Sequence, residues 1–263
     1  MDEWRHAALD LLRLDDVAAQ AAAVRALHAR AGGLRLDTGV SIAEPPGVPG
    51  RPARPRLVDP AALPARSPYT RTGRAALLHA VAHIEANAIR LALDAVWRFA
   101  GLPPEYYRDW LRVAAEEAEH FTLLAAHLAT LGHAYGDCDA HDGLWTMAER
   151  TRHDPVARMA LVPRTLEARG LDATPPMQAR LARAGDLQAV AILDVILRDE
   201  IGHVAVGNRW YRWLCAREGL DPEAHFETLL ERHRAPRPRP PFNRAARERA
   251  GFTAAELARL ERR

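Results

Sequence analysis

Apolar residues recur at helical spacing along most of the chain. In the first thirty or so residues they predict one or two amphipathic helices that end at Gly32 and Gly33. The apolar positions of this segment are Ala8, Leu11, Leu12, Val17, Ala21, Val24 and Leu27. A proline-dense stretch then begins at residue 44, and neither a helix nor a central strand tolerates that density. It predicts an extended connector. The sequence does not decide whether this connector is a flexible linker or a strap that lies against the protein body.

From Thr72 onward the helical pattern becomes strong. Long helices are predicted over 72–100, 104–131 and 186–218, each followed by a glycine. Residues 142–169 are also helical in pattern, but Pro155 and Pro163 interrupt them. Gly170 is expected to close that segment, with a short helix near 175–184 after it. The tail is predicted to hold a helix at 222–233, an Arg/Pro stretch at 234–241 and a short helical end.

No segment alternates convincingly in the manner of a strand, so the pattern predicts an all-α protein. Its centre is expected to be a four-helix bundle over 72–218. Before it stand an N-terminal helical arm (1–43) and the Pro-rich connector (44–71), which serves as a strap in this interpretation. A C-terminal helix with an Arg/Pro tail (219–263) follows the bundle.

The composition argues against several classes of function. All 36 basic residues are arginine, and 34 acidic residues leave a net charge of +2, which demands no nucleic-acid partner. Cys138 and Cys215 are too few for a disulfide framework or a cysteine-built zinc site. The N-terminus lacks the layout of a signal peptide, and no apolar run is long enough to span a bilayer. A soluble, cytoplasmic protein without a membrane partner is expected.

The candidate chemistry is a repeated arrangement of glutamate and histidine. Glu117 and His120 form one Glu-x-x-His pair, and Glu200 and His203 form another. Residues three apart lie on one helix face, so both side chains of a pair can reach one metal ion. A further glutamate precedes each pair at nearly the same separation, Glu85 before the first and Glu167 before the second. One such pair arises by chance on many helices, whereas two with matching upstream glutamates indicate a site.

These acids stand where each helix carries its apolar stripe. The neighbours of Glu85 on its face include Leu78, Val81 and Ile89, and Glu200 lies among Leu193, Ile196 and Leu197. Burying unpaired carboxylates together is costly, and bound divalent cations would remove that cost. Carboxylates mixed with imidazoles suit iron or manganese better than calcium or structural zinc.

Other polar residues are given supporting or ordinary roles. Glu116 and Asp199 each precede a Glu-x-x-His glutamate and are assigned to orient a ligand histidine by accepting its second ring N–H. Because Glu167 lies close to Gly170, the next short helix would have to run back before the long helix brings Glu200 level with it. His79 and His83 are interpreted as ordinary partly buried or surface histidines.

The sequence also resembles known families. The stretches HAVAHIEANAI, VPRTLEARGLD and ILRDEIGHVAVGNRWY, with PPFN and RAGF near the end, resemble the DUF455 family of ferritin-like proteins. The arrangement of ligands over about 72–218 looks like the di-iron carboxylate site of the ferritin-like superfamily, and its layout is similar to that of the MiaE family of tRNA-modifying hydroxylases. The resemblance implies two iron ions, or an iron and a manganese ion, held by Glu85, Glu117, His120, Glu167, Glu200 and His203.

Three functions follow from that resemblance. The first is an O2-activating oxidoreductase, an oxygenase or oxidase, with an external electron donor and a small-molecule or RNA substrate. The second is a ferroxidase or metal-storage protein without an organic substrate. The third is an RNA-modifying hydroxylase. The Arg/Pro segment 232–241 could contact RNA or an acidic partner, but its pattern favours a solvated, extended tail segment. The residues leave the substrate, the redox partner and the oligomeric state open.

Overall fold

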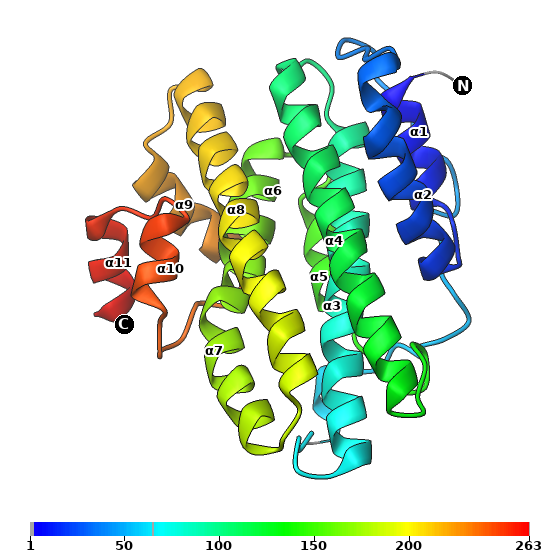
Figure 1. The fold of residues 1–263 in the computed structure, drawn as a ribbon. Coiled ribbons are helices and arrows are strands. Elements are labelled where there is room, and N and C mark those ends of the chain that lie inside the picture. The colour runs from blue at the N-terminus through cyan, green and yellow to red at the C-terminus, as the bar shows by residue number, and fades with distance from the viewer. Residues whose placement is uncertain (1–2, 65, 263) are drawn as a thin grey trace. The chain divides into compact units, whose positions relative to one another are not determined.

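In a computed structural model, which describes residues 3–64 and 66–262, the chain is helical. Over those residues no strand forms, and two isolated bridges join Glu3 to Arg35 and Leu57 to Ala140. The prediction of an all-α helical bundle is confirmed. The chain divides into two compact units, residues 1–142 and 143–263 (Figure 1).

The first unit is built around a long helical hairpin. Its elements are α1 (Trp4–Leu12), α2 (Val17–Arg30), η1 (Ala31–Gly33), η2 (Pro60–Ala62), α3 (Arg71–Arg98) and α4 (Pro104–Thr130). Helix α3 packs along α4, while α1 packs on α3 and α2 on α4 (Figure 1). Thr70 begins α3 by accepting a hydrogen bond from the Gly73 N–H, and Gly101, at a φ of 73°, makes the turn before α4.

The Pro-rich connector is a strap held against this unit rather than a flexible linker. The Arg51 guanidinium donates to both carboxylate oxygens of Asp142, at 3.0 and 2.6 Å. Arg56 binds Asp139 in the same two-pronged way, at 3.2 and 2.6 Å. Bidentate pairs of this kind fix orientation as well as position. The chain from Arg51 to Arg56 is therefore fixed at both ends.

The second unit contains the other long hairpin. Its elements are α5 (Gly143–Arg150), α6 (Pro155–Leu161), η3 (Val162–Glu167, a π-helical turn), α7 (Ala168–Arg183), α8 (Leu187–Arg217), α9 (Pro222–Arg232), α10 (Arg244–Arg249) and α11 (Ala254–Glu261). Helix α8 packs against α6, η3 and α7. A buried cluster joins α7 and α8 to the C-terminal segment; it comprises Ala168, Leu171, Ile201, Val204, Ala246, Ala250, Phe252 and Leu257.

The prediction that Gly170 ends a helix is wrong, as is the separate short helix at 175–184. Helix α7 runs through Gly170, Pro175 and Pro176 without a break. A proline inside a helix removes the hydrogen bond to the carbonyl four residues earlier, which here belongs to Leu171. Asn243 donates its side-chain amide to that carbonyl at 3.1 Å. A contact from the distant tail thus replaces the missing helical bond.

The other helix limits agree closely with the sequence pattern. The predicted helices at 72–100, 104–131 and 186–218 correspond to α3, α4 and α8. Of the helices that lie in the described part of the chain, none combines the length and apolarity needed to cross a membrane. The predicted bundle over 72–218 includes helices of both units, and its extent stays a prediction.

Candidate metal centre

Three of the predicted ligands meet in the first unit. Glu85 comes from α3, and Glu117 and His120 come from α4. The Nδ1 atom of His120 lies 3.2 Å from Glu85 Oε2 and 3.1 Å from Glu117 Oε2. One potential ligand atom from each of the three residues lies within 4.8 Å of the other two. The three donors therefore converge on one point, as a metal ion requires.

The hairpin register explains this meeting. Glu85 stands as far before the end of α3 at Arg98 as Glu117 stands after the start of α4 at Pro104. Because both helices rise about 1.5 Å per residue, equal separations from the turn bring the two side chains level. The structure thus brings these two glutamates together across the hairpin, as their positions in the sequence predict.

The cluster is deeply buried and electrostatically strained. Glu85 and Glu117 are 2% and 1% exposed, and His120 is fully buried. Burial raises the pKa of Glu85, and the nearby Glu117 carboxylate raises it further. Two carboxylates in a dry site repel each other when both are ionised. A divalent cation would stabilise both, and two carboxylates with one imidazole are donors that iron and manganese accept. These residues fit a bound metal ion.

The second unit presents the other Glu-x-x-His pair. Glu200 and His203 lie one turn apart on α8, at 6% and 0% exposure. A carboxylate oxygen of Glu200 and a ring nitrogen of His203 lie within 4.8 Å of each other. The pair is thus buried and aligned on one helix face, as the spacing predicts. This protein therefore contains buried Glu/His clusters that could hold a metal ion.

Glu167 lies on the π-helical turn η3, which packs against α8. Pro163 has no N–H to donate, and the Thr165 hydroxyl donates to the Ala160 carbonyl at 2.7 Å, so the regular α-helical ladder is interrupted here. The sequence pattern required a separate short helix to run back before α8 could bring Glu200 level with Glu167. Helix α7 makes that return in one continuous run. The separations of Glu167 from the end of α7 and of Glu200 from the start of α8 agree to within one helical turn. Glu167 is half-buried, and its role as a ligand stays a prediction.

The two acids predicted to orient histidines contact arginines on their own helices. Glu116 accepts from Arg112 on the preceding turn of α4, with oxygen–nitrogen distances of 3.1 Å. Asp199 forms an ion pair with its neighbour Arg198 at 2.9 Å. Both carboxylates remain partly exposed. Their predicted role in the outer part of the site stays a prediction.

His79 and His83 are buried, so their interpretation as partly buried or surface residues is wrong. His79 accepts a hydrogen bond from the Gly136 N–H at 2.9 Å, and His83 contacts the Tyr135 hydroxyl through Nδ1 at 2.9 Å. Burial lowers the pKa of each ring to about 4, so both are neutral at pH 7. The loop after α4 covers this face of α3. Nothing in the local pattern around residues 79–83 indicates that cover.

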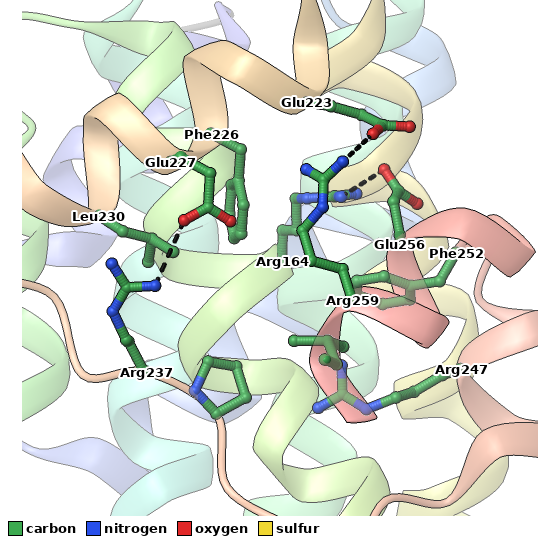
Figure 2. A pocket seen from close by; sticks show the side chains of 12 residues that line it. Arg164, Glu223, Phe226, Glu227, Leu230, Arg237, Arg247, Phe252, Glu256 and Arg259 are labelled. Atoms are coloured by element: carbon green, nitrogen blue, oxygen red, sulfur yellow. Dashed lines mark hydrogen bonds and ion pairs between the residues drawn. The ribbon is translucent and has the colours of Figure 1, made fainter. Parts of the chain in front are cut away.

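Sequence reasoning also missed a buried polar network in the second unit. Arg164, from η3, donates to Asn208 at 2.5 Å and forms an ion pair with Glu256 at 2.5 Å. Its guanidinium lies within 5 Å of the ring centroids of Phe226 and Phe252. Figure 2 shows Arg164, Glu256 and the two rings around a small cavity. The network connects the π-helical turn to the C-terminal helices. The sequence shows which residues are polar, but it does not show which of them pair with one another.

The fold and these residues define a class: an all-helical protein with buried glutamate and histidine clusters suited to a metal ion. The family whose model matches residues 13–258 has the description "Protein of unknown function (DUF455)", and the chain belongs to this family. It is 50% identical to a protein of Haemophilus influenzae, described as an uncharacterized protein, over 231 residues, which cover 85% of this chain and 80% of the relative. No solved structure gives a significant match.

Proposed function

We propose that this protein is a di-iron carboxylate oxidoreductase that acts with O2 and an external electron donor. The six predicted ligands, Glu85, Glu117, His120, Glu167, Glu200 and His203, would hold two metal ions, iron or a combination of iron and manganese. Iron bound there would supply the activation of O2 and the transfer of electrons.

The observation that carries the proposal is the buried meeting of Glu85, Glu117 and His120. A structural role alone does not explain why two carboxylates share a dry site with one imidazole, because their ionised forms repel and desolvation disfavours both. The second unit supports the proposal with the same motif on α8, where Glu200 and His203 are buried. In the proposal, each half contributes a carboxylate and an imidazole from one helix turn; Glu85 on α3 would complete the first half, and Glu167 at the end of η3 would complete the second.

The surrounding residues would protect this chemistry. Around the first cluster Ala82, Ala114 and Phe121 are buried, and around the second Ile196 and Val204 are buried. An apolar surrounding excludes water, which strengthens electrostatic contacts and limits side reactions. The carboxylates would balance the charge of the metal ions, and the rigid hairpins would fix the positions of the ligands.

The test is anaerobic loading of metal-free protein with Fe(II), followed by measurement of bound iron per chain and of near-ultraviolet absorbance after O2 is admitted. Glu117→Ala and Glu200→Ala remove one carboxylate from each half. Matched controls lie on the same helices: Glu119, which pairs with Arg25 at the surface at 2.9 Å, and the exposed Asp194. Both control positions are changed to alanine.

We expect two irons per chain in the wild type and in both controls, with an absorbance change on O2 addition that the two ligand variants lack. Folded wild-type protein that binds less than one iron would overturn the metal assignment. Two bound irons without any reaction with O2 would keep the metal site and overturn the oxidoreductase assignment.

A further inference from the structure

A second cavity lies in the first unit, beneath the strap. Its volume is about 430 Å³, within the usual range for small-molecule sites. Strap residues form one wall, and α3 with the loop after α4 forms the other. The lining residues are Arg51, Pro52, Ala53, Pro55, Arg56, Leu57, His83, Arg90 and Tyr135. None of the predicted metal ligands belongs to this set.

Arg90 is the unusual member of the lining. Its side chain is 1% exposed, and within the described part of the chain the Nε and Nη2 atoms have no hydrogen-bond acceptor. The guanidinium forms no ion pair with any residue in 3–64 or 66–262. Burial lowers the pKa of Arg90, which means that the charged form is disfavoured there. A guanidinium is always charged in proteins, so a buried one without an anion is strongly destabilising.

The nearby acids are already engaged with the strap. Asp142 binds the Arg51 guanidinium through both oxygens, and Asp15 accepts from the Arg51 backbone N–H at 2.9 Å. Arg56 is held by Asp139. The other two arginines of the cavity therefore contact carboxylates directly, and Arg90 is the one whose guanidinium is open to direct contact with an anionic ligand.

The remaining lining limits what that ligand can be. Pro52, Pro55 and Leu57 provide an apolar wall, while Arg90 provides a positive charge that no anionic group of residues 3–64 or 66–262 contacts directly. A monoanion with an apolar body matches both features, and the planar fork of arginine matches the geometry of a carboxylate. We propose that this cavity binds a small organic acid, with Arg90 as the counter-ion of its carboxylate and the strap as the wall against its apolar body.

This site is separate from the metal cluster. Arg90 follows Glu85 by five residues on α3, which places the two side chains about 140° apart around the helix. The proposal rests on the residues of the cavity alone and does not depend on the proposed oxidoreductase function. It can therefore be tested on metal-free protein, where a carboxylate has no metal ion to bind.

The experiment measures binding of benzoate, benzamide and inorganic phosphate to full-length, chelator-treated protein by titration calorimetry at constant ionic strength. Benzamide has the shape of benzoate without its charge. Arg90→Met removes the charge while keeping an apolar side chain of similar length. Arg108→Met is the matched control, because Arg108 is exposed on α4 and pairs with Glu105 on the same helix, at 3.3 Å.

We expect benzoate to bind more tightly than benzamide, and R90M to weaken benzoate binding by about 10- to 100-fold, the usual effect of losing a charge-assisted hydrogen bond. R108M should bind benzoate like the wild type. Should R90M fail to fold, Arg90→Lys gives the same test, because it keeps the charge and loses the planar fork, with a smaller loss of affinity.

Equal affinity for benzoate and benzamide would overturn the proposal, as would no binding up to millimolar concentration. Unchanged benzoate binding in R90M, or in R90K where R90M does not fold, would also overturn it. Arg90-dependent binding of phosphate in preference to benzoate would overturn the assignment to carboxylates.

Discussion

Gly207 on α8 allows the π-helical turn η3 to pack closely, and its replacement by alanine gives a sharp test. A Cβ atom at this position would lie 2.5 Å from Pro163 Cβ and 2.6 Å from Pro163 Cγ. Those separations are well below carbon–carbon contact at about 3.5–4.0 Å. The obstacle is a proline ring within a turn, so relief requires a shift of backbone rather than the rotation of a flexible side chain.

Two effects oppose each other in G207A. Alanine favours the helix over glycine by about 1 kcal/mol. Overpacking a buried contact costs about 1–3 kcal/mol, and here the value should lie at the upper end because the neighbour is rigid. We therefore expect G207A to lower the free energy of unfolding by about 1–2 kcal/mol, the difference between these two effects. Displacement of η3 should also loosen the position of Glu167 at its end.

Gly202, on the same helix, is the matched control. Apart from its chain neighbours and the adjacent helix backbone, no atom of residues 3–64 or 66–262 lies within 4 Å of a Cβ built there. G202A should therefore gain only the helix propensity of alanine and raise the free energy of unfolding by about 0.5–1 kcal/mol. Urea denaturation followed by far-ultraviolet circular dichroism measures both midpoints. The packing argument is refuted if G207A is as stable as the wild type, or if both variants change stability in the same direction.

Three further predictions concern buried polar groups. Glu117→Leu should stabilise the metal-free protein in thermal unfolding, because it removes one of two buried carboxylates, and should lose iron; a destabilised apoprotein would contradict this. Burial lowers the pKa of His79 to about 4, below its unfolded value, so the unfolded state binds the proton first. Stability should fall as the pH is lowered from about 6.5 to 4, and a His79→Gln variant should lose that part of the slope in pH-dependent denaturation. Glu256→Gln leaves the buried Arg164 charge without its carboxylate and should cost about 3 kcal/mol in urea denaturation; a loss under about 1 kcal/mol would show that Asn208 alone satisfies it.

The helical class, most helix limits and the positions of the candidate ligands follow from the sequence alone. Helical spacing of apolar residues marks α3, α4 and α8, because each helix buries one face and that periodicity is local. The acids within those apolar faces are equally local, so Glu85, Glu117 and Glu200 are recognisable from the pattern around them. Their burial is also predicted, because the apolar helix face on which they lie is the face that packs against other helices.

Features that depend on partners distant in the chain required the folded protein. Helix α7 continues through Pro175 because Asn243, far along the sequence, donates to the Leu171 carbonyl. The strap is fixed because Arg51 reaches Asp142, and the buried Arg90 lines one cavity together with residues of that strap and Tyr135 of the loop after α4. Propensity and periodicity describe a residue and its near neighbours. The free energy of a missing hydrogen bond or an uncompensated charge depends on groups that only folding brings together.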